Sequence, residues 1–196
     1  MAQPTLILIT GYARSGKDTL AEGLVRGASG AFPILRRNYA DSLKAAANTF
    51  LQEVGILNEF VNFNNETFKT KHRDILVALG AGARSVNASV FADILVEDCL
   101  GFEADQRDGR PPVVIASDWR YANELYVARG RLEELGWRIV TVMVQTPGIE
   151  AANQEEGLSI GEIVRNIAPD YTYVFRPQSA YQIHVEGKQL AAKLGI

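Results

Sequence analysis

Residues 5–19 of the chain read TLILITGYARSGKDT. Thr5 to Thr10 is a short, uncharged and β-branched run, typical of a strand that is covered on both faces. Gly11 to Lys17 fits the pattern G-x-x-x-x-G-K, and Leu20 to Val25 has helical spacing. The stretch therefore predicts a buried strand, a glycine-rich turn and a helix, in that order.

The chemistry of phosphate binding explains this spacing. A tight turn of small residues lets successive backbone N–H groups converge on a phosphate, and the following helix adds its N-terminal dipole. Lys17 then reaches the β- and γ-phosphates of a nucleoside triphosphate. We predict a phosphate-binding loop (P-loop) for ATP, made by Gly11, Tyr12, Ala13, Arg14, Ser15, Gly16, Lys17, Asp18 and Thr19.

The residue after the loop lysine departs from the usual pattern. A Ser or Thr normally stands there and binds Mg²⁺ through its hydroxyl, whereas this chain has Asp18 followed by Thr19. A carboxylate also binds Mg²⁺, directly or through water, so either side chain can serve. Arg14, inside the loop, is equally compatible with a phosphate contact and with a position facing solvent.

Composition and charge limit the classes of protein to consider. The chain has 196 residues, 47% hydrophobic and 22% charged, which fits a single globular α/β domain. Its net charge of −3 argues against a general nucleic-acid binder. The single cysteine, Cys99, excludes an intrachain disulfide and is expected to be a buried structural thiol. No apolar run approaches the ~20 residues of a membrane span, so we expect a cytoplasmic protein with no membrane partner.

Strands and helices alternate along the chain, which predicts βαβ units and a three-layer α/β sandwich with a mainly parallel sheet. We expect one domain over residues 1–196, with a helical insertion at about 42–100 and a lid-like region at about 146–168. Further strands are expected at 34–40, 113–117, 137–144, 171–175 and 182–185. Helices are expected at 42–54, 71–79, 88–100, 121–135 and 188–194, and one further helix after residue 157 is expected to end at about 167.

Polar residues that directly follow the predicted strands are the next candidates, because ligands of open α/β sheets bind at the carboxyl ends of strands. Asp118 follows a buried strand, where an acid commonly orients Mg²⁺ or its waters. Arg120 can pair with that acid or bind a phosphate. Asp41 can cap a helix or belong to the site, and Lys44, one turn later, can reach an anionic substrate.

Two arginines bracket an apolar segment farther along. Arg73 lies near the start of a predicted helix that Gly80 and Gly82 are expected to end, and Arg84 lies just beyond. Such a pair can clamp a phosphate from two sides.

Four segments together resemble the bacteriophage deoxynucleoside monophosphate kinases. They are residues 11–19 (GYARSGKDT), 39–44 (YADSLK), 73–84 and 118–124 (DWRYANE), and their order agrees with that family over about the first 145 residues. The resemblance implies a nucleoside-monophosphate-kinase-like fold, ATP and Mg²⁺ as co-substrates, and a homodimer. It implies an acceptor site made by Asp41, Lys44, Arg73, Gly80, Arg84, Arg120, Asn123 and Glu124. It also implies catalytic roles for Lys17, Asp118 and Arg120, and a metal held by Asp18, Thr19 or Asp118.

The sequence departs from that family in several places. Ser42, Val77 and Ala81 stand where the family has Pro, Gln and Thr. Past Val144 the family's arginine and H-x-S-E-like element are replaced by Gln145-Thr146-Pro147 and Glu155-Glu156-Gly157-Leu158. Monophosphate kinases commonly bring lid arginines to the transferred phosphate, and Arg165 and Arg176 are the candidates to replace them.

The leading hypothesis is a deoxynucleoside monophosphate kinase in the cytoplasm, or in the host cytoplasm if a phage encodes it. The main alternative is a related phage kinase that phosphorylates 5-hydroxymethyluracil bases in DNA, and only this alternative makes DNA a partner. The loop alone also allows a P-loop switch protein, a dephospho-coenzyme A kinase or a shikimate-type kinase.

Overall fold

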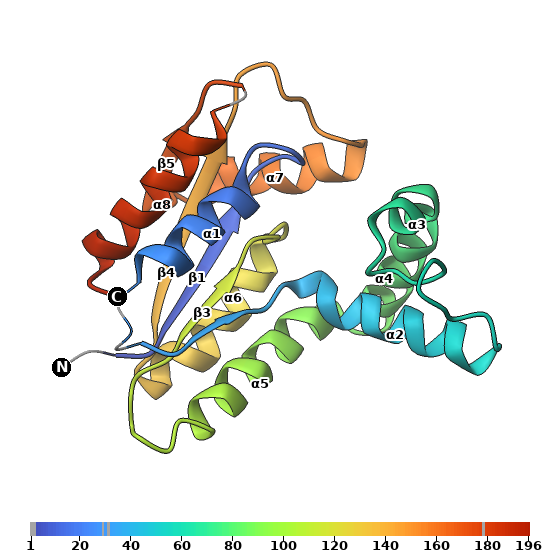
Figure 1. Cartoon of the computed structure of the whole chain (residues 1–196), viewed down its shortest axis with the longest axis horizontal. Coiled ribbons are helices and arrows are strands. Elements are labelled where there is room, and N and C mark those ends of the chain that lie inside the picture. Colours follow the sequence, from blue (N-terminus) through green and yellow to red (C-terminus); the bar gives the residue numbers. More distant parts are fainter. Residues whose placement is uncertain (1–2, 29, 31, 178) are drawn as a thin grey trace.

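The computed structural model describes residues 3–28, 30, 32–177 and 179–196, and within them a five-stranded, wholly parallel sheet in the order β2-β3-β1-β4-β5 (Figure 1). β1 lies at the centre and pairs with β3 on one side and β4 on the other. The strands are β1 (Thr5–Thr10), β2 (Ile34–Arg36), β3 (Val113–Ala116), β4 (Arg138–Gln145) and β5 (Tyr171–Val174).

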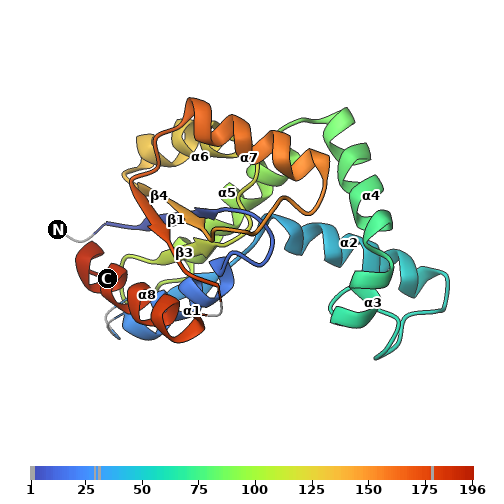
Figure 2. The same cartoon turned by 90° about the horizontal axis from the view of Figure 1, so that it is seen from above.

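Helices cover both faces of this sheet, so the domain has three layers (Figure 2). α1 and α8 pack on one face, and α5, α6 and α7 pack on the other. The helices are α1 (Lys17–Gly27), α2 (Tyr39–Glu53), α3 (Glu66–Lys71), α4 (Arg73–Val86), α5 (Val90–Ala104), α6 (Ala122–Leu132), α7 (Gln154–Asn166) and α8 (Ala180–Leu194). A short 3₁₀ turn, η1 (Glu133–Leu135), follows α6. The expected α/β class with a parallel sheet is confirmed.

The central strand shows why the sequence folds this way. All six residues of β1 are buried, and successive side chains point to opposite faces of the sheet. Leu6 and Leu8 belong to the core shared with α5, α6 and α7, whereas Ile7 and Ile9 belong to the core shared with α1 and α8. A strand buried on both faces needs apolar side chains on both, and this explains the uninterrupted apolar run from Leu6 to Ile9.

A helical arm made of α2, α3 and α4 projects to one side of the sandwich (Figures 1 and 2). It has a small core of its own, formed by Ala47, Leu51, Phe63 and Leu76. α5 does not belong to this arm, because its apolar side chains pack into the main core against α6. The projecting part therefore ends near Val86 and not at about residue 100, where the sequence suggested that the insertion ends.

Two elements differ from the sequence-based predictions. The expected end of a helix at Gly80 and Gly82 is wrong, because α4 continues through both glycines to Val86. The expected strand at residues 182–185 is also wrong, because α8 is one helix from Ala180 onward. A Cβ atom on Gly187 would lie 2.4 Å from the Leu20 carbonyl oxygen of α1. This glycine therefore permits close helix packing and does not break the helix.

β2 is also shorter than expected and ends at Arg36, since α2 already begins at Tyr39. Cys99 is fully buried, as expected, and burial raises the pKa of its thiol to about 12. Among the described residues no single helix is long and apolar enough to cross a membrane. The bent pair α4 and α5, with 89° between them, meets that length and composition only when taken together.

Candidate active site

The loop between β1 and α1 has the backbone of a phosphate cradle. Gly11 has φ 138° and Gly16 has φ 97°, a region that side chains disfavour. A Cβ atom on Gly11 would lie 2.1 Å from the Val144 carbonyl oxygen. Gly16 is the N-cap of α1 and has no side chain to accept the first N–H groups of that helix. The N-terminus of α1 is therefore left open to an anion.

Neighbouring elements anchor this loop. The Thr146 hydroxyl, just beyond β4, donates to the Ser15 carbonyl at 3.1 Å. Ser15 itself is buried, and its hydroxyl has no hydrogen-bond partner among the described residues. A cavity of about 230 Å³ lies beside the loop, and Tyr12, Thr146 and Ile160 are among the residues that line it. Arg14 is exposed at the tip of the loop, with φ 66°.

Lys17 spans the mouth of the loop. Its ammonium group donates to the Tyr12 carbonyl at 2.7 Å, so the side chain is folded back over the cradle. Burial and, to a smaller extent, the nearby Arg120 guanidinium lower the pKa of Lys17 to about 8, whereas the carboxylate of Glu156 opposes the shift. A phosphate bound here would stabilise the charged form of Lys17, which burial disfavours in the protein without a ligand.

Asp18, the residue after the loop lysine, contacts residues at the carboxyl ends of β2 and β3. Its carboxylate accepts from the Ser117 hydroxyl at 2.7 Å and from Arg36 at 3.1 Å. The Asn38 side-chain oxygen accepts from the Ser117 N–H at 2.8 Å and joins the start of α2 to this group. The Asp18 side chain is 78% exposed, so a cation can reach it from solvent.

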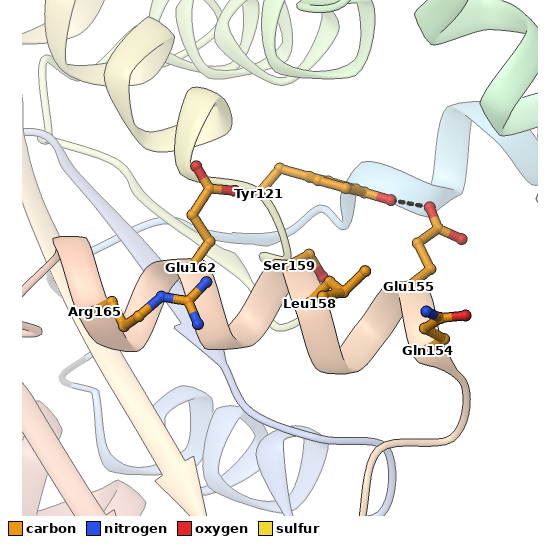
Figure 3. A pocket seen from close by; sticks show the side chains of 7 residues that line it. All are labelled: Tyr121, Gln154, Glu155, Leu158, Ser159, Glu162 and Arg165. Atoms are coloured by element: carbon orange, nitrogen blue, oxygen red, sulfur yellow. Dashed lines mark hydrogen bonds between the residues drawn. The ribbon is translucent and has the colours of Figure 1, made fainter.

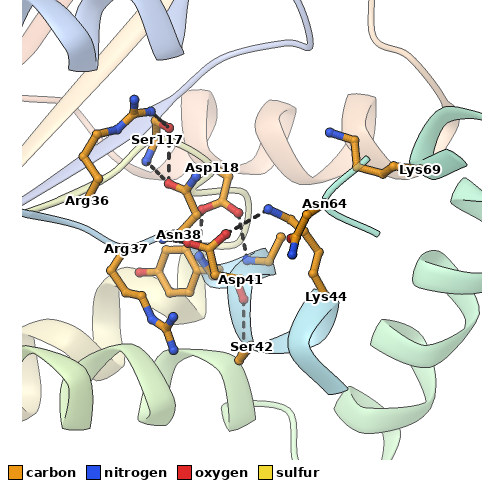
Figure 4. Close-up of polar contacts among 12 residues, drawn as sticks. Arg36, Arg37, Asn38, Asp41, Ser42, Lys44, Asn64, Lys69, Ser117 and Asp118 are labelled. Carbon is orange, nitrogen blue, oxygen red and sulfur yellow. Dashed lines mark hydrogen bonds and ion pairs between the residues drawn. The ribbon is translucent and has the colours of Figure 1, made fainter. Parts of the chain in front are cut away.

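Asp118 has a different environment from the one that the sequence suggested. Its two carboxylate oxygens accept the N–H groups of Tyr39 and Ala40 at 2.8 and 2.9 Å, at the first turn of α2 (Figure 4). Burial raises the pKa of the Asp118 carboxyl, while these two hydrogen bonds oppose the shift. Asp118 thus ties the loop after β3 to the arm, and its metal role stays a prediction.

The next two residues, Arg120 and Tyr121, contact the first turn of α7. Arg120 forms an ion pair with Glu156 at 3.1 Å. The Tyr121 hydroxyl hydrogen-bonds to Glu155 (Figure 3). Burial raises the pKa of Tyr121 to about 12, and the bond to Glu155 adds to the shift. Both acids at the start of α7 are therefore engaged by partners after β3.

Arg84 reaches the same place from the arm. Its guanidinium lies 4.5 Å over the Tyr121 ring and donates to the Tyr121 hydroxyl at 3.2 Å, while its Nε atom is buried without a hydrogen-bond partner among the described residues. Gly80, one turn earlier in α4, leaves room for this guanidinium, since a Cβ there would lie 3.1 Å from it. Arg73 is exposed on the same helix, about 16 Å away along its axis. The two arginines thus occupy separate positions on one helix and do not bracket a turn.

Four other predicted acceptor residues hold the scaffold together. Asp41 accepts from the Asn38 N–H at 2.9 Å and pairs with Lys44 at 2.8 Å. Burial pushes the pKa of Asp41 up, but these two contacts lower it below its usual value. Asn123 donates to the Ala88 carbonyl at 2.8 Å. A contact between these four residues and an acceptor stays a prediction.

Glu124, the fourth of them, is buried at the start of α6. It accepts the N–H groups of Arg120 and Tyr121 at 3.0 and 3.1 Å. Burial raises the pKa of Glu124 to about 7, and these two hydrogen bonds oppose the shift. The carboxyl thereby fixes the backbone that presents the two preceding side chains.

A groove of about 640 Å³ runs along α7 on the side that faces Tyr121 (Figure 3). Its lining includes Tyr121, Leu158, Glu162 and Arg165, and among the described residues neither Lys17 nor the loop contributes to it. Arg165, a candidate lid arginine, thus lines a surface away from the loop, and Arg176 is exposed just beyond β5. Neither has been brought to Lys17 in this structure.

Several residues of this site were not predicted from the sequence. Arg36, Asn38 and Ser117 are brought together only by the pairing of β2 with β3. Glu156 reaches Arg120 across 36 positions of the chain. One local signal was available for Ser117, since it is the last residue of the predicted strand and directly precedes Asp118.

Comparison with known proteins finds matches among solved structures but none among family models or curated proteins. No protein-family model matches the chain, and no curated protein matches it significantly. A sugar kinase from Janibacter has a TM-score of 0.48 at 13% identity, covering 98% of this chain and 96% of that one. A gluconokinase from Sinorhizobium meliloti has a TM-score of 0.45 at 13% identity, covering 100% and 98%. An APS kinase from Thiobacillus denitrificans has a TM-score of 0.43 at 16% identity, covering 98% and 29%.

All three similar structures are kinases. At these identities and TM-scores the likeness does not say what this chain acts on, and no family model supports the finer resemblance to the phage enzymes. The function has to be inferred from the geometry of the site itself.

Proposed function

We propose that this chain transfers the γ-phosphoryl group of ATP to a deoxynucleoside 5′-monophosphate and produces a deoxynucleoside diphosphate. The observation that carries the proposal is the loop between β1 and α1, with two glycines at positive φ and Lys17 folded across its mouth. An open helix N-terminus and a partly buried lysine at the carboxyl end of the central strand suit a triphosphate tail.

Phosphoryl transfer needs mainly positioning and charge stabilisation from the protein, and this site supplies those. An oxygen of the acceptor phosphate attacks the γ-phosphorus, the bond from that phosphorus to the β,γ-bridging oxygen breaks, and ADP leaves. Lys17 and the loop amides would hold the β- and γ-phosphates. Arg120, which lies close enough to Lys17 to lower its pKa, would stabilise charge on the transferred group.

The residues present also fit a magnesium ion. Mg²⁺ in kinases is usually held by one or two carboxylates together with phosphates and water. Asp18 offers one exposed carboxylate in the first turn of α1, and the described residues contain no cluster of three or more acids, cysteines or histidines. Asp18 would therefore hold the metal, which neutralises charge on the phosphates when it is bound.

Arg84, Tyr121 and the arm would receive the acceptor. The buried Nε atom of Arg84, which has no partner among the described residues, is suited to an acceptor phosphate. Lys44, near the start of α2, is held by Asp41 at 2.8 Å and would add a second cation. The choice of a deoxynucleotide rests on the motif resemblance, and the net charge of −3 favours a mononucleotide over a DNA acceptor.

A transfer assay with γ-labelled ATP and Mg²⁺ tests this proposal. The acceptors are the four common deoxynucleoside monophosphates, 5-hydroxymethyl-dUMP and DNA that contains 5-hydroxymethyluracil. We expect label in a deoxynucleoside diphosphate, a loss of at least 100-fold in Lys17→Met and normal transfer in Lys193→Met, which removes an exposed lysine at the far end of α8.

The other outcomes of this assay each contradict the proposal in a different way. Label found only in DNA would replace it with the DNA-kinase alternative. ATP hydrolysis without any labelled acceptor would favour a switch protein. Equal transfer by wild type and Lys17→Met would remove the loop from the mechanism.

A further inference from the structure

Two consecutive acids at the start of α7 contact two consecutive residues after β3. Glu156 pairs with Arg120 at 3.1 Å, and Glu155 hydrogen-bonds to the Tyr121 hydroxyl. The two acids differ in their surroundings, because Glu156 is 1% exposed whereas Glu155 lies on the surface. A buried carboxylate is retained in a fold only where partners compensate the loss of water.

The Glu156 carboxylate is held in a single position. Its Oε2 atom accepts the Ala152 N–H at 2.7 Å. The backbone N–H of Glu156 donates to the side chain of Asn153, which caps α7, at 2.8 Å. These two hydrogen bonds fix both the carboxylate and the backbone of Glu156. The remaining oxygen, Oε1, is left to face Arg120.

Arg120 lies beside the loop that carries Lys17, because the N–H of Trp119, one residue earlier, donates to the Ile9 carbonyl at 3.2 Å, near the end of β1. The Arg120 guanidinium lowers the pKa of Lys17, after burial, and Glu156 and Asp18 oppose that shift. Like charges in a partly buried site repel, and without a nearby anion the long Arg120 side chain, which is 34% exposed, would turn toward solvent. Glu156 supplies that anion from the side of Arg120 that α7 covers.

We propose that Glu156 is a positioning residue that holds the Arg120 guanidinium beside Lys17, so that both cations face the γ-phosphate when ATP binds. This inference rests on the proposed function. Glu156 itself touches no substrate. A guanidinium that is already oriented does not have to lose its rotamer freedom during the reaction, and this preorganisation favours the transition state more than the ground state.

A double-mutant cycle on kcat tests this role. Glu156→Gln keeps the size of the side chain and an acceptor for the Ala152 N–H but removes the charge that holds Arg120. We expect kcat to fall at least 10-fold with the ATP KM within about twofold of wild type. Glu156→Asp, which keeps the charge, should lose less. Glu162→Gln, an exposed charge removal on the same helix, should match wild type.

The Arg120→Ala background separates positioning from a general structural role. If Glu156 acts through Arg120, Glu156→Gln lowers kcat no further once Arg120 is absent. An equal loss in both backgrounds, or an unchanged kcat in Glu156→Gln alone, would overturn the proposal. Thermal unfolding of each variant shows whether the protein is folded under the assay conditions.

A measurement without substrates distinguishes failure of this inference from failure of the proposed function. NMR titration of ¹⁵N-labelled lysine in the substrate-free protein follows Lys17 directly. Arg120→Ala should raise the pKa of Lys17 in the wild-type background but by much less in the Glu156→Gln background, because there the guanidinium has already turned away from Lys17. If this difference appears in a protein that phosphorylates no acceptor, the positioning stands and the kinase assignment fails. If Arg120→Ala raises the pKa of Lys17 equally in both backgrounds, the positioning fails whatever the enzyme does.

Discussion

At the scale of single residues, the site holds charges that reduce the stability of the empty protein. Lys17 is the clearest case, because burial and the adjacent Arg120 bring its pKa to about 8, from 10.5. The ammonium is disfavoured in the fold, and the penalty is fully present below pH 8. The penalty disappears as the pH rises from 8 to 10.5, because the folded protein releases the Lys17 proton in this range while the unfolded chain still binds it.

Lys17→Met should therefore make the protein more stable at pH 7 although it abolishes transfer. We expect a gain of roughly 1–2 kcal/mol and a Tm higher by a few degrees, since Lys17 keeps some exposure to solvent. The gain should shrink between pH 8 and pH 10. Urea unfolding of both proteins at several pH values measures this, and a variant that is less stable than wild type at pH 7 would contradict it.

For Glu124 we expect the stability of the protein to change with pH in the opposite direction. Its pKa is raised from 4.5 to about 7, so the folded protein keeps a proton that the unfolded chain releases between these values. Its contribution to stability is present below about pH 4.5 and falls by on the order of 2–3 kcal/mol as the pH rises to 7.

Glu124→Gln removes this titration. The stability of wild type relative to Glu124→Gln should be lower at pH 7.5 than at pH 5, as measured by urea unfolding. Glu134→Gln, an exposed acid in the turn after α6, is the control and should show no such difference. A Glu124→Gln difference that is equal at both pH values would show that the carboxyl titrates normally.

At the scale of elements, the glycines explain where prediction from the sequence succeeded and where it failed. The loop was predictable because its signal is local: a buried strand, fixed spacing and a helix within 21 residues, Thr5 to Val25. The course of α4 was not, because Gly80 serves to make room for Arg84 and Leu43 and does not end the helix. The pairing of Glu156 with Arg120 depends on tertiary contacts that no local pattern shows.

The continuity of α4 can be tested at Gly82. This glycine is exposed within the helix, and a Cβ atom there would meet nothing within 4 Å. Gly82→Ala should therefore raise the free energy of unfolding by about 0.5–1 kcal/mol, because alanine is the better helix former. Chemical unfolding measures the change. A loss of stability would instead support a helix that ends at this glycine.

The two arginines of α4 should contribute unequally. Arg84 lies against Tyr121 at the site, whereas Arg73 is exposed at the far end of the same helix. We expect Arg84→Ala to raise the acceptor KM by about 10-fold or more and Arg73→Ala by less than about threefold, with the ATP KM unchanged in both. Steady-state kinetics at saturating ATP checks this. A larger effect at Arg73 would move the acceptor toward the tip of the arm.

At the scale of the whole molecule, a central strand carries the phosphate loop, and cations and acids from three separate elements meet around residues 120 and 121. The arm supplies Arg84, the segment after β3 supplies Arg120, and α7 supplies Glu156. Sequence patterns predicted the three layers and the parallel sheet, because each buried strand is marked by its own apolar run. They did not predict how the arm and α7 meet, because that depends on side chains far apart in the chain.

The central claim is that the loop between β1 and α1 grips a triphosphate. A crystal structure with Mg²⁺ and a non-hydrolysable ATP analogue tests this most directly. We predict that the β- and γ-phosphates lie within the turn of residues 11–17, with the Lys17 ammonium moved from the Tyr12 carbonyl onto their oxygens. Nucleotide bound elsewhere, with the turn vacant and Lys17 still on Tyr12, would contradict the account.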